Sequence, residues 1–170
     1  QKDNFVLESE WTLQTSSGTS SNNDVSASLF SFNLGYKPIS TRFLNSVFLG
    51  LDRVSGDDSS TETAEGFSKE FGARHKHHGF YDYTDHKKYF GHGHDGLNEI
   101  NAKANIDILK RTNLLIALHN FRSAVKDIYY GSEVNFIFKT KHNDEVSSEI
   151  GSVFFFPDQG NEKTLPFFYL

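Results

Sequence analysis

The stretch LNEINAKANIDI at residues 97–108 alternates apolar and polar side chains without interruption. The apolar series is Ile100, Ala102, Ala104, Ile106 and Ile108, and the polar series is Glu99, Asn101, Lys103, Asn105 and Asp107. An amphipathic helix would repeat its apolar residues with a period near 3.6, whereas the period here is two. The stretch therefore predicts a β-strand with one apolar face and one polar face.

The same period extends along the chain on both sides of this strand. It recurs upstream in three segments and downstream in four, of which 114–121 is more uniformly apolar and 145–156 alternates less cleanly. The other segments are 4–15, 25–36, 42–53, 131–140 and the final 164–170. Segments of this kind predict strands with one buried and one exposed face, so we expect an all-β chain of about eight strands.

The connections between these segments alternate in length. Short ones fall at 37–41, 110–113 and 141–144; longer ones fall at 15–25, 54–96, 122–130 and 157–163. An antiparallel up-and-down meander with every long loop at one end follows directly. Transmembrane β-barrels combine short periplasmic turns, long extracellular loops, an apolar outside, a polar inside and aromatic girdles. We therefore predict an antiparallel up-and-down transmembrane β-barrel.

The composition supports this prediction and excludes several other classes of protein. Seventeen Phe, seven Tyr and one Trp occur in a chain that is only 36% hydrophobic, as expected where only one face of each strand is apolar. The net charge of −5 and the lack of a basic run argue against a nucleic-acid partner. The chain has no cysteine, which excludes disulfides and thiolate metal ligands. It also has no methionine, so we expect a processed mature form or a fragment.

A soluble secreted or periplasmic β-barrel binding module, with its apolar faces turned inward, is the main alternative. Period alone does not decide which face looks inward. The membrane barrel is favoured by ionisable residues along the polar faces and by aromatics near the strand ends. The ionisable examples are Glu8 with Glu10, Lys103 with Asp107, and Glu133 with Lys139, and the aromatic ones are Phe5, Tyr36 and Phe43.

Residues 55–96 form the longest connection and carry six of the eight histidines. They show no sustained apolar period, so we predict a long, polar, His-rich extracellular loop. Its histidines suit a divalent metal such as Zn²⁺, Ni²⁺ or Cu²⁺, and the candidate ligands are His75, His77, His78, His92 and His94. No pair has an established ligand spacing. The favoured interpretation is a polar loop, exposed or folded into the lumen, that narrows the pore. A metal-binding protein that uses this loop is the alternative.

Other residues with chemical potential have simpler explanations. Asp57 and Asp58 follow Gly56 and are predicted to be turn residues rather than Ca²⁺ ligands. His119 alternates with Ala117 and Phe121 on an inner face, where we expect a structural histidine. The sequence contains no Ser–His–Asp arrangement, paired carboxylates, nucleophile elbow or phosphate loop, so no enzyme and no required cofactor are predicted.

The polar strand faces predict the lining of the pore. The residues assigned to it are Glu8, Glu10, Arg42, Asp52, Glu99, Lys103, Asp107, Glu133, Lys139 and Glu149. Seven of these ten are acids and three are bases. Such a wall repels a polyanion and suits neutral sugars or cationic solutes.

Six segments, in order, resemble the later part of the alginate-export family of outer-membrane β-barrels. They are LDRVSGDD (51–58), FSKEFGARHKHHGFYDYT (67–84), GLNEINAK (96–103), ALHNF (117–121), GSEVNFIFK (131–139) and GSVFFFPD (151–158). The resemblance runs from about residue 42 to residue 170 and rests on the order of the segments, since each is weak alone. The resemblance implies a barrel with many more strands than the eight expected here. The last strand of the family usually finishes on an aromatic residue, whereas this chain ends on Leu170.

The resemblance implies a porin-like channel in the outer membrane of a Gram-negative bacterium, for passive passage of small solutes or saccharides. Residues 1–170 would then be one barrel domain or the C-terminal part of a larger one, although eight strands can also close alone. The implied partners are outer-membrane lipid, the solute itself and other outer-membrane proteins.

Overall fold

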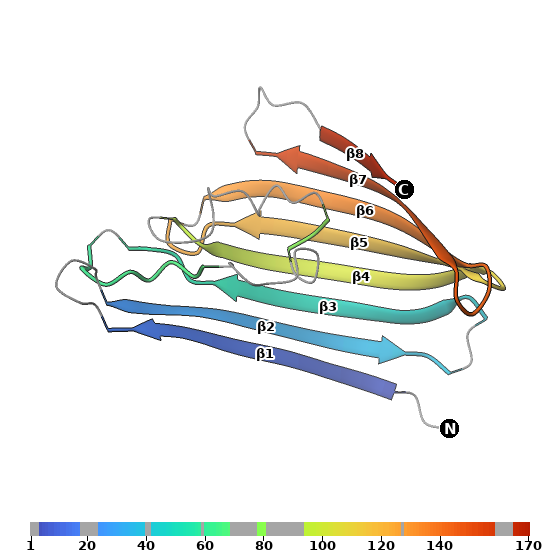
Figure 1. Cartoon of the computed structure of the whole chain (residues 1–170), viewed down its shortest axis with the longest axis horizontal. Helices are drawn as coiled ribbons and strands as arrows, with labels where there is room; N and C mark the ends of the chain where they lie inside the picture. Colours follow the sequence, from blue (N-terminus) through green and yellow to red (C-terminus); the bar gives the residue numbers. More distant parts are fainter. Residues whose placement is uncertain are drawn as a thin grey trace.

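The structure is a computed structural model that describes residues 4–17, 24–39, 42–58, 60–68, 78–80, 94–126, 128–158 and 165–170. Eight strands follow one another along the chain (Figure 1). They are β1 (Asn4–Ser16), β2 (Val25–Lys37), β3 (Leu44–Val54), β4 (Leu97–Leu109), β5 (Thr112–Arg122), β6 (Tyr129–Lys141), β7 (Ser147–Pro157) and β8 (Leu165–Tyr169).

All eight strands belong to a single sheet whose spatial order is the sequence order, β1 to β8. Each neighbouring pair is antiparallel, which confirms the predicted up-and-down meander. Among the described strands, β1 and β8 are not paired with each other, so the sheet is open at both edges. In the described part of the chain, no helix combines the length and the apolar character needed to cross a membrane.

The strand boundaries agree with the sequence prediction to within a few residues. The predicted contrast in connection length holds in part. Only residues 110–111 separate β4 from β5, whereas residues 55–96 separate β3 from β4, but the connections at 38–43 and 123–128 are both six residues long. Antiparallel pairing places the connections 38–43, 110–111 and 142–146 at one end of the sheet, called the turn end. The connections 17–24, 55–96, 123–128 and 158–164 lie at the other, called the loop end (Figure 1).

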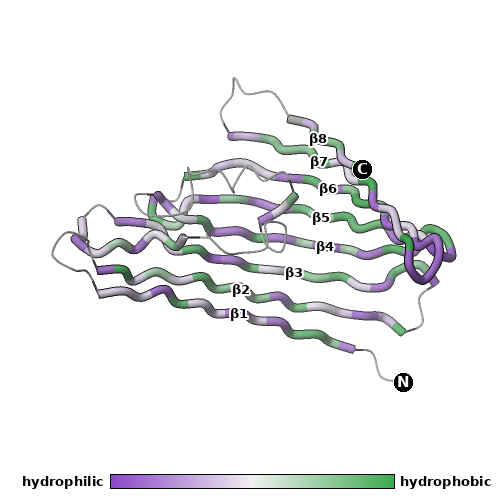
Figure 2. The backbone as a smooth tube through the Cα atoms, viewed as in Figure 1, coloured by the Kyte–Doolittle hydropathy of each residue, from purple (hydrophilic) through white to green (hydrophobic). Residues whose placement is uncertain are grey.

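The two faces of the sheet differ sharply in exposure, and the strands alternate in hydropathy along their length (Figure 2). The face that carries the apolar series, called the apolar face, is open: Trp11 is 73% exposed, Leu49 65% and Ile100 63%. The opposite face, called the polar face, is covered toward the loop end: Asn135 is fully buried and Glu133 is 1% exposed. The period of two therefore holds, and at the loop end the polar series is the buried one.

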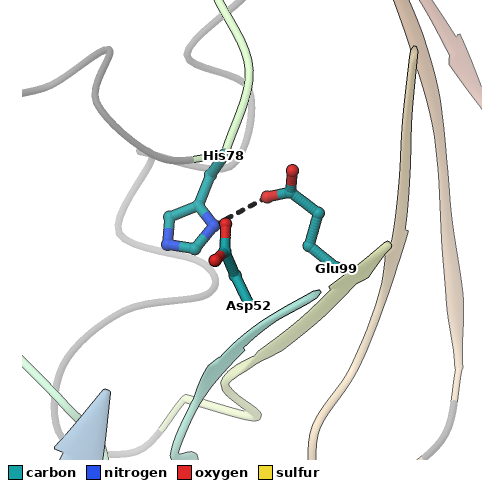
Figure 3. Close-up of side chains that lie close together, drawn as sticks. All are labelled: Asp52, His78 and Glu99. Carbon is teal, nitrogen blue, oxygen red and sulfur yellow. Dashed lines mark hydrogen bonds and ion pairs between the residues drawn. The ribbon is translucent and has the colours of Figure 1, made fainter. Parts of the chain in front are cut away.

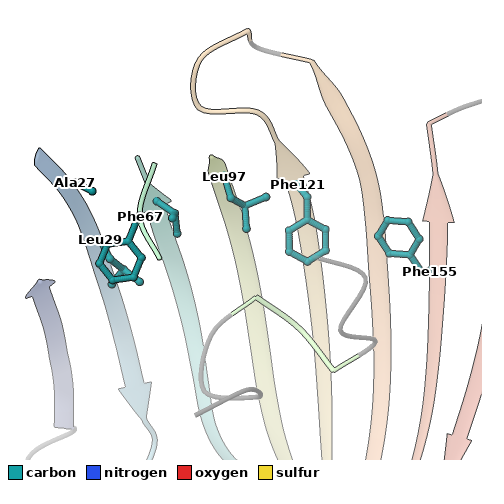
Figure 4. Close-up of a cluster of buried hydrophobic side chains, with 7 residues drawn as sticks. Ala27, Leu29, Phe67, Leu97, Phe121 and Phe155 are labelled. Carbon is teal, nitrogen blue, oxygen red and sulfur yellow. The ribbon is translucent and has the colours of Figure 1, made fainter. Parts of the chain in front are cut away.

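A small apolar cluster lies at the loop end of the polar face (Figure 4). Its members come from β2, β3, β4, β5 and β7 and from the β3–β4 connection: Ala27, Leu29, Val54, Phe67, Leu97, Phe121 and Phe155. The rings of Phe121 and Phe155 stack with their centroids 6.3 Å apart.

The first part of the β3–β4 connection packs over this cluster and is fixed by hydrogen bonds. Ser26 donates its backbone N–H to the carbonyl of Ala64, and Ala64 donates in turn to Asp24, which adds a short parallel bridge beside β2. Gln14 of β1 makes a reciprocal pair with the backbone of Ser68, with distances of 2.6 and 2.9 Å. These bonds satisfy backbone groups that a loop crossing an apolar cluster would otherwise bury unpaired.

Two glycines bring the start and the end of the β3–β4 connection together. The backbone N–H of Asp57 donates to the carbonyl of His94 at 2.7 Å. A Cβ atom added at Gly56 would lie 2.2 Å from the carbonyl carbon of Asp95, and Gly96 has a φ of 64°. Only glycine combines this close approach with a left-handed conformation at no steric cost. The loop therefore leaves and re-enters the sheet through a narrow neck.

Candidate functional site

Two rows of side chains cross the polar face next to the apolar cluster, and the strand register sets both. Residues directly opposite one another on paired strands point to the same face. One row runs Glu10, Ser31, Asp52, Glu99, Phe121, and the next runs Glu8, Asn33, Gly50, Asn101, His119, Glu133. The register thus brings carboxylates from four different strands onto one stretch of wall.

Glu99 is the centre of this arrangement and is almost completely buried. Its Oε1 lies 2.6 Å from Nδ1 of His119 and accepts a hydrogen bond of 3.0 Å from the amide of Asn101. Its Oε2 lies 2.8 Å from Nδ1 of His78. Both imidazoles therefore direct Nδ1 at the same carboxylate, and with Nδ1 protonated each Nε2 is left as the second functional atom of its ring.

The His-rich loop reaches this wall through residues 78–80. His78 and Gly79 have φ values of 66° and 84°, so the backbone turns through two consecutive left-handed residues. The turn directs the backbone N–H of Phe80 at Oε1 of Glu133, where the hydrogen bond is 2.6 Å long. A Cβ added at Gly79 would lie 2.5 Å from the same oxygen. Two buried glutamates, Glu99 and Glu133, hold this part of the loop against the sheet.

Asp52, His78 and Glu99 form a compact group of potential metal ligands (Figure 3). One ligand atom from each lies within 4.8 Å of the other two. Asp52 and Glu99 are directly paired across β3 and β4, and His78 is brought to them by the loop. All three are buried.

Other buried polar atoms on the polar face have no hydrogen-bond partner among the described residues. They are Nε2 of His119, Oδ1 of Asn101 and both side-chain polar atoms of Asn135. A buried polar atom left unpaired costs about 1–3 kcal/mol. Several in one place indicate a region built to hold something polar.

The turn end of the polar face is different in kind. Lys139 and Glu149 form an ion pair of 2.9 Å in which the lysine side chain is 63% exposed. Asp107 is exposed and accepts a hydrogen bond from Asn45 at 2.7 Å. Ion pairs this exposed contribute little to stability, so this end is solvated wall.

Nine of the ten residues predicted to line a pore lie on the polar face of the strands; Arg42 does not. β3 begins at Leu44, two residues after Arg42, and the guanidinium lies 5.6 Å from the ring centroid of Phe43. A register shift between Leu44 and Ser46 ends the regular alternation there. Without Arg42, the predicted lining residues on the strands are seven acids and two bases, Lys103 and Lys139.

The structure places two of the five predicted metal-ligand histidines. His78 lies against Glu99, as described, whereas the described contact of His94 is through its backbone carbonyl. His75, His77 and His92 lie outside the described residues, so their part of the prediction stays a prediction. The companions of His78 that sequence reasoning missed are Asp52 and Glu99, which it assigned only to the pore lining. The alternation along β3 and β4 indicated that Asp52 and Glu99 share one face. Nothing in the sequence indicated the register that places them directly opposite each other.

Asp57 and Asp58 serve the neck of the loop, as predicted for turn residues. Oδ1 of Asp57 accepts the backbone N–H groups of Glu65 and Gly66. Oδ1 of Asp58 accepts the N–H of Ser60 at 3.0 Å, and this hydrogen bond lowers the pKa of the Asp58 carboxyl below its ordinary value.

Comparisons of this chain with protein-family models, with curated proteins and with solved structures find no match in any of the three. The resemblance to the alginate-export family therefore stays a prediction that rests on the six segments quoted above. The geometry of the sheet is therefore the basis for a proposed function.

Proposed function

We propose that the chain forms channel wall in the outer membrane of a Gram-negative bacterium, as a β-barrel or part of one. The observation that carries this proposal is the contrast between the faces. Large apolar side chains are exposed on one face, while carboxylates and amides are buried on the other. A protein that stays in water rarely exposes a continuous apolar surface of this extent.

The apolar face is continuous across neighbouring strands. Leu51 is directly paired with Ile100 across β3 and β4, and both are at least half exposed. Each apolar side chain of this size favours removal from water by about 1.5–3 kcal/mol when fully covered. Lipid would cover the whole face at once. The soluble alternative needs these residues inside the barrel, and the exposed face gives it no support.

The polar face would then line a water-filled lumen, closed by strands beyond the β1 and β8 edges. Its acids outnumber its bases, so the lumen favours cationic or neutral solutes over polyanions. Residues 78–80, held by Glu99 and Glu133, would narrow the lumen near its loop end. We infer passive passage of small solutes or saccharides, with no covalent chemistry.

The first experiment is fractionation of cells that make the protein, followed by detergent extraction and electrophoresis with and without boiling. We expect membrane-bound protein that needs detergent and changes mobility on heating, as closed barrels do. Recovery of soluble protein with no heat shift would overturn the proposal and return the apolar residues to a protein interior.

The second experiment is conductance of the purified protein in planar bilayers under a salt gradient. We expect a reversal potential that indicates cation preference. The double variant Glu8→Lys with Glu10→Lys should move it toward anion preference, because both positions lie on the polar face of β1. Trp11→Lys on the apolar face of the same strand would not act in this way. Anion preference of the unaltered protein would contradict the assigned lining.

A further inference from the structure

We propose that Asp52, His78 and Glu99 bind a divalent transition-metal ion of the Zn²⁺ class at the wall of the sheet. The site differs from a cluster of histidines within the loop, because two of its three ligands come from β3 and β4. The metal-site proposal does not depend on the channel proposal, because metal binding can be measured without measuring transport.

The distances suit one ion. Bonds from Zn²⁺ to imidazole nitrogen or carboxylate oxygen are about 2.0–2.2 Å, so two ligand atoms of a tetrahedral site lie about 3.4 Å apart. Nδ1 of His78 and Oε2 of Glu99 are 2.8 Å apart, and all three ligand atoms lie within 4.8 Å. The ion would replace the proton between His78 and Glu99 once these two atoms move apart by about half an ångström.

The donor set selects the class of metal. Imidazole nitrogen favours Zn²⁺ and related transition metals over Ca²⁺ and Mg²⁺, which prefer oxygen ligands alone. Two carboxylates with one imidazole are hard enough to exclude Cu⁺, which prefers sulfur. Water would complete the coordination, as three-ligand zinc sites commonly allow.

The surroundings are those of a built site rather than of a chance surface cluster. The side chains of His78 and Glu99 are 1% and 0% exposed. His119 and Asn101 bond the other oxygen of Glu99 and so orient it, as the outer partners of metal-binding carboxylates do.

Unused polar groups give a second, independent observation. His119 is 4% exposed and Asn101 is 2% exposed, yet Nε2 of His119 and Oδ1 of Asn101 have no partner among the described residues. Both side chains are tied to Glu99 through their other polar atom. These unpartnered atoms therefore belong to the same buried polar network as Glu99.

The test is a titration of the purified full chain, freed of metal with EDTA, with Zn²⁺ by calorimetry and with Co²⁺ by visible absorption. We expect one tight equivalent and a Co²⁺ d–d band. Asp52→Asn and Glu99→Gln, which keep the shape of each side chain, should each weaken binding at least tenfold. His142→Ala, in the turn between β6 and β7, should leave it unchanged.

The rest of the histidine loop needs a separate arm. A variant with His75, His77, His92 and His94 all changed to Ala should keep the tight equivalent. Loss of binding in that variant, with full binding in Asp52→Asn, would overturn the proposal and place the ion in the loop. X-ray absorption of the unaltered Zn²⁺ protein needs no variant: one imidazole with oxygen ligands supports the site, and several imidazoles reject it.

Discussion

The two ends of the polar face are built from the same kinds of residue and behave differently. At the loop end, Glu99 is buried, contacts two imidazoles and lies beside the apolar cluster. At the turn end, Glu149 shares an exposed ion pair with Lys139 and accepts a hydrogen bond from Tyr169. Both glutamates belong to the same polar series of their strands. The difference comes from the β3–β4 connection, which covers one end and leaves the other open.

This comparison shows that strand alternation decides which face a carboxylate occupies, whereas a distant loop decides whether it is buried. Burial multiplies the consequence of any change, because a buried polar group that loses its partner is not rescued by water. Substitutions at the loop end should therefore have larger effects than matched substitutions elsewhere. The free energy of unfolding, measured by urea titration of detergent-folded protein in EDTA, puts this contrast on one scale.

The largest effect is expected for Phe121→Ala in the apolar cluster. Phe121 is fully buried and stacks on Phe155, so its removal leaves a cavity and should lower the free energy of unfolding by about 4 kcal/mol. The matched control is Phe138→Ala on the apolar face, where Phe138 is 40% exposed and detergent can fill the space. We expect about 1 kcal/mol or less there. Equal losses at the two positions would contradict the contrast.

The second largest loss is expected for Glu99→Ala, because it leaves the buried imidazoles of His78 and His119 without their carboxylate partner. We expect a loss of about 3 kcal/mol, the scale for removing one partner from a buried charged network. Glu149→Ala is the matched control and should cost less than about 1 kcal/mol, as exposed ion pairs do. A loss at Glu149 as large as that at Glu99 would show that the turn end is not solvated wall.

Gly79→Ala tests the attachment of the loop and should cost about 2 kcal/mol. Part of this is the left-handed φ of 84° and part is the approach of the new methyl to Glu133. A double-mutant cycle with Glu133→Ala separates the two, since the clash disappears in that background and only the backbone strain remains. Strictly additive losses would mean that residues 78–80 are not held against Glu133.

The smallest effect is expected for Lys139→Ala. Its ion pair with Glu149 is mostly exposed, so we expect a loss of about 0.5 kcal/mol or less that shrinks further as salt screens the pair. Unfolding titrations at low and high ionic strength measure both quantities. A large loss that did not depend on salt would place Lys139 in a buried environment.

The strands were predictable because their signal is local. Apolar and polar side chains alternate so regularly from Ile100 to Ile108 that this stretch alone predicts β4. The short turn at residues 110–111 then predicts that β5 pairs with it in the antiparallel sense. Arg42 lies two residues before β3 begins, so strand alternation does not determine its direction, and its place in the pore lining stays a prediction. The register shift near Leu44 has no local marker in the sequence.

The candidate site was not predictable in full because its residues are distant in sequence. Asp52 and Glu99 lie on opposite sides of the loop, and only the pairing of β3 with β4 places them opposite each other. His78 reaches them through two consecutive left-handed residues, and only the glycine gives a local hint of that. Composition predicted a histidine-rich loop, but it could not tell which histidine meets the wall.

The nearest-neighbour order of the strands has a consequence for the order of folding. Closing the 55–96 loop costs roughly 2–3 kcal/mol more chain entropy than closing the turn at 110–111. We therefore expect β1–β3 and β4–β8 to pair internally first and to join last along the β3–β4 seam. Pulsed hydrogen exchange during refolding, with seam amides protected earliest, would contradict this order. The contacts at the neck, around Gly56 and Gly96, would then form last, as β1–β3 joins β4–β8.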